Sequence, residues 1–371
     1  MISPAKFCQQ LDTLGLRFFT GVPDSLLKSL CAYIDNEYPK SSHVITANEG
    51  NAISLACGHY LGSGKPAVVY MQNSGLGNAV NPLASLADEA VYSIPMLLVI
   101  GWRGEAGVKD EPQHVKQGVI TEEQLALLDI DYMIIDQSSN LYLSLPALIN
   151  KMHHLNKPVA LLVKKGTFSD VKALQQPHQY TLNREQILET LLDLIPSDGL
   201  VVSTTGKTSR EVFELRRAKK QPNNDFLTVG AMGHTASIAM GVAKAQPDKK
   251  VFALDGDGSL LMHMGAMPVI AQQGLNNLTH VVLNNGCHES VGGQLTVANE
   301  INIVAIANAC GYKTATCIET LADLINAWPI VTQAGTHLIE IKINAGSRSD
   351  LGRPTNSPIE NKKAFMQHAL N

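Results

Sequence analysis

The chain has 371 residues, of which 45% are hydrophobic and 17% are charged, and its formal net charge is −4. The length predicts two or three domains, and the composition is typical of a globular protein. The negative net charge does not favour binding to nucleic acid. No run of about 18 apolar residues predicts a membrane span, and the N-terminus lacks a signal-peptide pattern. The six cysteines are scattered without a Cys-x-x-Cys pair, which favours a reducing, cytoplasmic setting.

Short apolar runs alternate with segments of helical length in the first half of the chain. This alternation is typical of an α/β fold with parallel sheets. The predicted strands of the first half cover residues 44–47, 67–71, 96–100 and 159–163.

Glu49 is the first candidate functional residue. It directly follows the strand at 44–47 within Asn48-Glu49-Gly50-Asn51 and opens a predicted helix. Ligands of open α/β sheets bind at the carboxyl edge of the strands, where this side chain is expected. A glutamate in the first turn of a helix is also favoured by the helix dipole alone, so position by itself leaves both interpretations open.

A polar segment divides the chain near residues 168–182. Its centre, 175–180, shows neither a helical nor a strand period, and Thr181 or Asn183 can cap a helix over 184–194. We therefore predict two domains, 1–170 and 180–371. The predicted strands of the second domain cover residues 200–203, 251–254, 281–283 and 338–343.

The segment Asp255-Gly256-Asp257-Gly258-Ser259 lies between the strand at 251–254 and a segment of helical length, 259–273. The next strand leads into Asn284-Asn285, so a β-α-β unit places Asp257 and the asparagines at one edge of the sheet. Their oxygens are ligands that Mg²⁺ prefers. The glycines allow a phosphate to approach, and no Gly-x-Gly-x-x-Gly opens this helix as a dinucleotide fingerprint would require.

This pattern resembles the signature of the thiamine diphosphate enzymes. The resemblance implies that Asp257 and Asn285, with the backbone carbonyl of Cys287, hold Mg²⁺ against the cofactor's diphosphate. Mn²⁺ or Ca²⁺ would suit the same oxygen ligands. It also implies that the Glu49 carboxyl lies beside N1′ of the aminopyrimidine and makes the bound cofactor reactive.

Two further segments of the second half resemble cofactor-binding segments of these enzymes. In the segment 229–234, the carbonyl near Gly230 would accept from the 4′-amino group, and Met232 would support the bent cofactor. Gly206 and Lys207, after the strand at 200–203, are candidates for the diphosphate together with Gly256, Gly258 and Ser259. Core packing of Met232 and a plain helix cap at 204–209 are the alternatives.

The resemblance implies two parallel-sheet domains, a pyrimidine-type domain followed by a diphosphate-type domain. The chain has no room for the middle domain that many pyruvate decarboxylases carry. In such enzymes the N-terminal domain of one subunit activates cofactor held by the C-terminal domain of another. We therefore expect a homodimer or a higher homo-oligomer.

Three predicted loops are rich in Arg, Lys, Ser and His, as an anionic substrate would require: 20–25, 101–114 and 345–354. They resemble phosphonopyruvate decarboxylase, and the similarity covers essentially the whole chain. That family converts 3-phosphonopyruvate to phosphonoacetaldehyde and CO₂ in phosphonate biosynthesis. The resemblance favours Arg348 and Arg353 as phosphonate ligands, with Ser25 and Lys109 as further candidates.

His114 is the predicted proton donor or acceptor, with His288 and Glu289 as rivals. Sulfopyruvate decarboxylase is the near alternative, since its substrate differs only in the anion. The fused chain favours phosphonopyruvate, because sulfopyruvate enzymes are often split into two subunits. A carboligase like acetolactate synthase and a non-catalytic, cofactor-binding subunit are the remaining alternatives.

Overall fold

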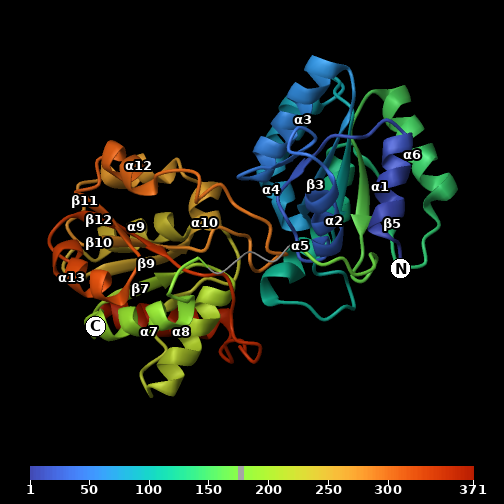
Figure 1. Ribbon diagram of the computed structural model, residues 1–371. Coiled ribbons are helices and arrows are strands. Elements are labelled where there is room, and N and C mark those ends of the chain that lie inside the picture. The colour runs from blue at the N-terminus through green and yellow to red at the C-terminus, as the bar shows by residue number, and fades with distance from the viewer. Residues whose placement is uncertain (174–178) are drawn as a thin grey trace. The chain divides into compact units, whose positions relative to one another are not determined.

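The computed structural model describes residues 1–173 and 179–371, and the chain forms an N-terminal and a C-terminal compact unit (Figure 1). Most of the polar centre of the predicted boundary, residues 174–178, lies outside the described residues. Each unit is built on its own parallel sheet.

The described strands of the N-terminal unit form a six-stranded parallel sheet in the order β2-β1-β3-β4-β6-β5. They are β1 (Phe19–Gly21), β2 (His43–Ile45), β3 (Ala67–Gln72), β4 (Met96–Gly101), β5 (Asp131–Ile135) and β6 (Val159–Val163). Strands β3, β4 and β6 are nearly continuous apolar runs, as expected where a sheet is covered on both faces.

Helices cover both faces of this sheet. One apolar core joins the sheet to α1, α2 and α6, and another joins it to α3, α4 and α5. Two short turns, η1 and η2, flank α4. The bounds are α1 (Pro4–Thr13), α2 (Lys28–Glu37), α3 (Glu49–Ser63), η1 (Asn73–Gly75), α4 (Leu76–Pro82), η2 (Leu83–Ala87), α5 (Pro112–Leu127) and α6 (Leu141–Leu155).

The C-terminal unit repeats this architecture with a six-stranded parallel sheet in the order β11-β12-β10-β9-β7-β8. The strands are β7 (Leu200–Ser203), β8 (Phe226–Leu227), β9 (Val251–Gly256), β10 (Leu278–Asn284), β11 (Thr314–Ile318) and β12 (Thr336–Lys342). Alternate residues of β9 point to opposite faces of the sheet. Phe252 and Leu254 belong to the apolar core on one face, and Val251 and Ala253 belong to the core on the other face.

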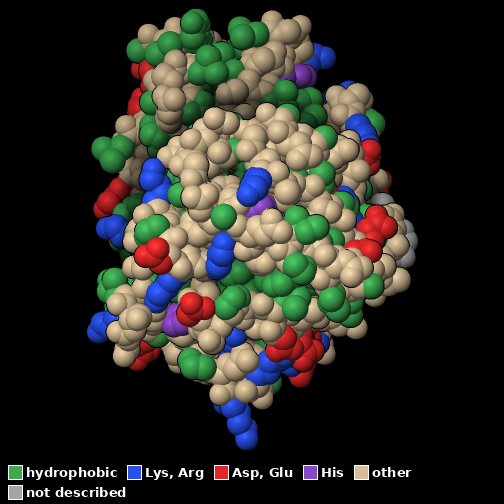
Figure 2. All heavy atoms as spheres, turned by 90° about the vertical axis from the view of Figure 1, so that its left-hand side faces the viewer, with side chains coloured by type: hydrophobic (Ala, Val, Ile, Leu, Met, Phe, Trp, Pro, Cys, Tyr) green, Lys and Arg blue, Asp and Glu red, His purple; other side chains and the backbone are tan. Residues whose placement is uncertain are grey.

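One core of the C-terminal unit contains α7, α8 and α13, and the other contains α9, α11, α12 and α14. The helices are α7 (Arg184–Leu194), α8 (Lys207–Ala218), α9 (Thr235–Ala245), α10 (Asp257–Met262), α11 (Ala266–Ala271), α12 (Ile303–Cys310), α13 (Leu321–Val331) and α14 (Pro358–Leu370). On the face shown in Figure 2, Lys and Arg are interspersed with Asp and Glu.

The predicted α/β class with two parallel sheets is confirmed, and so is the Asn183 cap, which forms a capping box with Gln186. The prediction of one helix over 259–273 is wrong, since α10 ends at Met262 and α11 begins at Ala266. Pro268 explains the break. In a continuous helix the proline ring would clash with the carbonyl of Met264, and Pro268 has no N–H to donate to that carbonyl. Among the described residues, no helix has the length and apolar character needed to cross a membrane.

Candidate active site

Glu49 is the first residue of α3, directly after its N-cap Asn48, whose side chain accepts from the backbone N–H of Asn51 (3.0 Å). The Glu49 side chain is buried, and its Oε2 accepts a hydrogen bond from Nδ2 of Asn78 (2.7 Å). A Cβ added to Gly75 would lie 2.4 Å from Glu49 Oε1. The carboxylate is therefore held between Asn78 and the backbone at Gly75, at the carboxyl end of the sheet.

Gly75→Ala is expected to lower kcat by about 100-fold, because the added methyl group displaces the Glu49 carboxylate from its position. The φ of Gly75 is −71°, which alanine adopts readily, so the backbone is unstrained. Gly77→Ala is the matched control, since its Cβ would meet no atom within 4 Å. Steady-state kinetics and thermal melting of both variants check this. Equal kcat in the two variants would contradict the assignment.

The predicted loop at 20–25 begins two residues too early, since Thr20 and Gly21 lie in β1. The loop that follows is anchored by Asp24, which sequence reasoning did not select. Its Oδ1 accepts from Nε2 of Gln72 (2.6 Å), and its Oδ2 accepts from the N–H of Leu26 (3.0 Å). Burial raises the pKa of this carboxyl, and no room exists for a side chain at Gly101 beside it. Asp24 therefore fixes the position of Ser25 next to it.

Ser25 Oγ accepts from Nη1 of Arg103 (2.7 Å). Arg103 forms a two-pronged ion pair with Asp110, which also accepts from the N–H of Gly104 (2.9 Å). These bonds close the loop 101–111 on itself and leave Lys109 exposed. The structure thus brings Ser25 against the 101–114 segment, as a shared substrate region would require.

His114 lies in the first turn of α5, so its predicted place in a loop is wrong. The residue directly follows Pro112-Gln113, and proline at the first helical position explains the early helix start. The side chain is 8% exposed, and its Nδ1 has no hydrogen-bond partner among the described residues. Burial, assisted by Arg103, lowers the pKa of His114, so the imidazole is neutral at pH 7 and suited to accept a proton.

In the C-terminal unit, Asp257 opens α10 directly after β9 and is 3% exposed. Its Oδ2 accepts from Oγ1 of Thr296 (2.5 Å), a residue that sequence reasoning missed. Burial raises the pKa of Asp257 to about 6, because a buried carboxylate lacks the solvation of water. A cation beside it would relieve this cost.

The two asparagines at the end of β10 take different positions, since Asn284 is the last residue of the strand and Asn285 follows it. Asn284 is fully buried, and its Nδ2 donates to Oε1 of Glu340 (2.7 Å) within the sheet. Asn285 lies in the loop at the strand end, where its Oδ1 accepts from the N–H of Cys287 (3.1 Å). Of the two, only Asn285 lies beyond the end of the strand, and its role as a metal ligand stays a prediction.

The donor set fits Mg²⁺ bound by oxygen. Among the described residues, no group of three or more His, Cys, Asp and Glu side chains forms a metal site. A site made of the Asp257 carboxylate, the Asn285 amide and a backbone carbonyl needs no such group. Burial raises the pKa of the Cys287 thiol to about 12, so its sulfur stays protonated and only its carbonyl suits the cation.

The side chains of His288 and Met232 pack closely against Gly258, so a side chain added there would have to shift His288 slightly. A Cβ there would lie 3.2 Å from Nδ1 of His288 and 3.4 Å from Cε of Met232. Ser259 Oγ accepts from the N–H of Gly233 (3.1 Å), which ties the 229–234 segment, with Gly230, to the loop at Asp257. The structure therefore brings together the segments predicted to hold the pyrimidine and the diphosphate.

Gly206 adopts a φ of +90° that favours glycine, and Lys207 begins α8. Lys207 Nζ pairs with Glu289 (2.6 Å), which also accepts from Arg184 (2.7 Å). Burial alone would raise the pKa of Glu289, but these cations hold it below its ordinary value. Glu289 is therefore ionised and unsuited to donate a proton. Burial lowers the pKa of its rival His288 to about 4, so His288 is also no donor at pH 7.

The tail that follows β12 is held by charged contacts. Arg348 pairs with Glu185 of α7 (2.9 Å), with Glu214 of α8 and with Asp350 (3.2 Å). A pocket of about 340 Å³ lies between this tail and the start of α7. Arg353, further along, is exposed. The guanidinium of Arg348 is thus occupied by carboxylates that an anionic substrate would have to displace.

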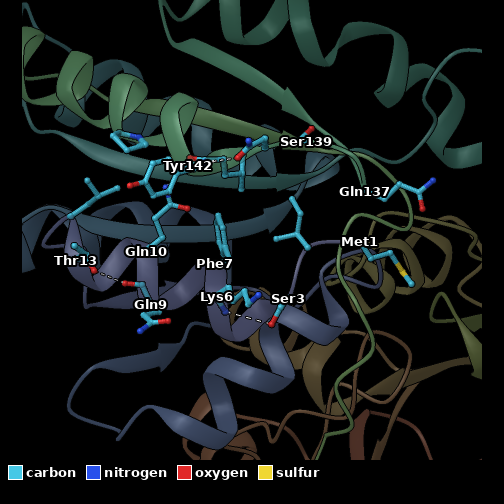
Figure 3. A pocket seen from close by; sticks show the side chains of 15 residues that line it. Met1, Ser3, Lys6, Phe7, Gln9, Gln10, Thr13, Gln137, Ser139 and Tyr142 are labelled. Atoms are coloured by element: carbon cyan, nitrogen blue, oxygen red, sulfur yellow. Dashed lines mark hydrogen bonds between the residues drawn. The ribbon is translucent and has the colours of Figure 1, made fainter.

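A separate groove of about 800 Å³ lies in the N-terminal unit between α1 and the start of α6 (Figure 3). Gln10 of α1 donates to the carbonyl of Leu141 across it (2.7 Å), and Tyr142 is exposed at its rim. None of the candidate site residues lines this groove.

Two family models match the chain. The N-terminal TPP binding domain of the thiamine pyrophosphate enzymes matches residues 5–127, and the C-terminal TPP binding domain matches residues 204–341. Together with the two parallel sheets and the oxygen-rich loop at Asp257, these matches define a thiamine diphosphate enzyme.

Curated relatives narrow this class. The phosphonopyruvate decarboxylase of Streptomyces viridochromogenes is 36% identical over 98% of the chain, and that of Streptomyces hygroscopicus is 34% identical over 100% of the chain. Each alignment covers 94% of the relative. Sulfopyruvate decarboxylase of Methanosarcina acetivorans is 26% identical over 98% of the chain and 96% of the relative. The chain therefore belongs to the family of thiamine diphosphate-dependent decarboxylases that includes these enzymes. It decarboxylates a 2-keto acid, with Mg²⁺ as the family's usual metal partner.

Proposed function

We propose that the protein decarboxylates 3-phosphonopyruvate to phosphonoacetaldehyde and CO₂, with thiamine diphosphate and Mg²⁺, as a step of phosphonate biosynthesis. The observation that carries the proposal is the sequence identity to two phosphonopyruvate decarboxylases, 36% and 34%, against 26% to the sulfopyruvate decarboxylase of Methanosarcina acetivorans. The presence of both domains in one chain does not favour phosphonopyruvate over sulfopyruvate, contrary to the prediction from sequence. The sulfopyruvate decarboxylase of Methanosarcina acetivorans also aligns with this chain over 96% of its own length.

The cofactor supplies an electron sink for the bond that breaks when CO₂ leaves. Asp257, Asn285 and the carbonyl of Cys287 would hold its metal, while Gly206, Lys207, Gly256, Gly258 and Ser259 would surround its diphosphate. Gly230 and Met232 would seat the pyrimidine. Glu49, oriented by Asn78, would exchange a proton with the pyrimidine nitrogen. We propose that Glu49 acts on cofactor of a neighbouring subunit in a cytoplasmic homo-oligomer.

The neutral imidazole of His114 lies near the segment that holds Ser25 and Arg103, and we assign it the role of proton acceptor in the reaction. Its buried, unpartnered Nδ1 supports this role, because a buried polar atom without a partner is costly unless a ligand supplies one. Ser25 and Lys109 would contact the substrate's anionic end together with Arg348 and Arg353.

Arg353→Ala is expected to raise KM for phosphonopyruvate by about 10-fold or more, because a charged hydrogen bond to the phosphonate is lost. The affinity for thiamine diphosphate should stay within about twofold. Arg217→Ala, which removes an exposed arginine from α8, is the control. An unchanged KM in Arg353→Ala would show that the tail does not bind the phosphonate.

The test of the proposal compares kcat/KM for phosphonopyruvate, sulfopyruvate and pyruvate under identical conditions. We expect phosphonopyruvate to exceed sulfopyruvate by about 10-fold or more, because a doubly charged phosphonate gains more from paired cations than a singly charged sulfonate. Pyruvate lacks the second anion and should react slowest. A higher value for sulfopyruvate would overturn the proposal in favour of that substrate.

A further inference from the structure

Four charged side chains form a cluster that contacts Asn285 through Glu289. They are Arg184, Lys207, Glu211 and Glu289. Arg184 donates through Nε and Nη2 to both oxygens of Glu211 (2.7 and 2.9 Å) and through Nη1 to Glu289 (2.7 Å). Lys207 pairs with the other oxygen of Glu289 (2.6 Å). The side chains of Arg184, Glu211 and Glu289 are only 6%, 1% and 12% exposed. Two cations and two anions balance one another, so the cluster is electrically neutral.

Glu289 connects this cluster to the predicted metal ligand. Its Oε2 accepts from Nδ2 of Asn285 (2.9 Å). An ionised carboxylate has no proton to donate, so the Asn285 amide must turn its nitrogen toward Glu289. The oxygen of the same amide then points the other way, where it accepts from the N–H of Cys287 (3.1 Å) and from the Cys287 thiol (3.6 Å), and a cation would take the place of this weak thiol contact.

We propose that Glu289 is a positioning residue that sets the orientation of the Asn285 amide and thereby tightens metal binding. Arg184 and Lys207 hold Glu289 in place, and Glu211 holds Arg184. Groups that orient a metal ligand through a hydrogen bond are worth about 10- to 100-fold in metal affinity. The inference rests on the proposed metal role of Asn285, and it gives the His288-Glu289 segment a function other than proton transfer.

The neighbouring asparagine offers a matched control. Asn284 also donates through Nδ2 to a glutamate, Oε1 of Glu340 (2.7 Å), and Glu340 is likewise paired with a lysine, Lys342 (2.7 Å). This pair lies within the sheet, between β10 and β12. Glu340→Gln therefore repeats the chemical change of Glu289→Gln beside an asparagine that is not a predicted ligand.

The experiment measures binding of Mn²⁺, used as the probe, by electron paramagnetic resonance in the presence of saturating thiamine diphosphate. A glutamine at position 289 can present either its oxygen or its nitrogen to Asn285, so it no longer enforces one orientation of the Asn285 amide. Glu289→Gln should therefore raise the dissociation constant of Mn²⁺ by about 10-fold or more, whereas Glu340→Gln should leave it within about twofold. Thermal melting of both variants reports any general loss of structure. An unchanged Mn²⁺ affinity in Glu289→Gln would overturn the inference.

A double variant that exchanges the carboxylate and the amide between positions 285 and 289 separates the orientation effect from a general loss of stability. Asn285→Asp alone places a carboxylate against Glu289 and should weaken Mn²⁺ binding, although aspartate is the stronger ligand. The double variant Asn285→Asp/Glu289→Gln restores a donor facing an acceptor, and it should recover the affinity at least in part. Asn285→Asp binding as tightly as wild type would overturn the inference. Wild-type protein that binds no Mn²⁺ with the cofactor would instead overturn the proposed metal site.

Discussion

Glu49→Gln should lower kcat by about 100- to 10,000-fold with thiamine diphosphate saturating. Glutamine has nearly the volume of glutamate and still accepts from Nδ2 of Asn78 through its amide oxygen, so the local packing is kept. It cannot exchange a proton, and loss of a positioned general acid or base typically costs this factor. Steady-state kinetics, with cofactor affinity measured in parallel, checks the expectation.

Glu37→Gln, at the exposed C-terminal end of α2, is the control for a loss of one negative charge. We expect it to keep wild-type kcat. The Glu49 variant should also keep its affinity for the cofactor within a few-fold, because its predicted role is activation rather than anchoring. Near wild-type turnover of Glu49→Gln would remove Glu49 from the reaction.

Asp257→Ala has the second large expected effect, a loss of about 100-fold or more in the Mg²⁺-dependent affinity for thiamine diphosphate. The substitution removes the one charged ligand of the proposed site, a side chain that is only 3% exposed. Calorimetric titration of the cofactor with and without Mg²⁺ measures this. Asp248→Ala, an exposed aspartate that precedes β9 at the other end of that strand, is the control.

The pH dependence of metal binding follows from the same residue. Burial raises the pKa of Asp257 to about 6 in the metal-free chain, so below that pH the cation must displace a proton. Metal affinity should therefore be constant above about pH 7 and fall as pH drops through 6. Mn²⁺ titrations at several pH values check this. An affinity that stays constant down to pH 5 would contradict Asp257 as a ligand.

The sequence predicted the buried strands well because each is a continuous apolar run, as in β4 and β6. It missed β1, which has three residues, and β8, which has two, since no period can be seen over so few positions. The strands β5 and β11 were also missed. They lie at the sheet edges and are only partly buried, so their apolar pattern is weak.

Within the candidate site, Glu49 and Asp257 could be predicted because each follows a strand in a distinctive local sequence. Their partners Asn78 and Thr296 were not predicted, since they lie 29 and 39 residues away and only the fold brings them together. The segment 72–78 after β3 carried a signal for Asn78, as a polar run after a buried strand. Nothing local marked Arg184, which pairs with Glu289 across 105 residues.

The most direct test of the central claim is the product balance from phosphonopyruvate alone, with purified protein, thiamine diphosphate and Mg²⁺. The account predicts CO₂ and free phosphonoacetaldehyde in equal amounts, and no turnover when either the cofactor or the metal is withheld. A ligated product in place of the aldehyde would identify a carboligase. Absence of CO₂ from the complete mixture would contradict the decarboxylation of phosphonopyruvate.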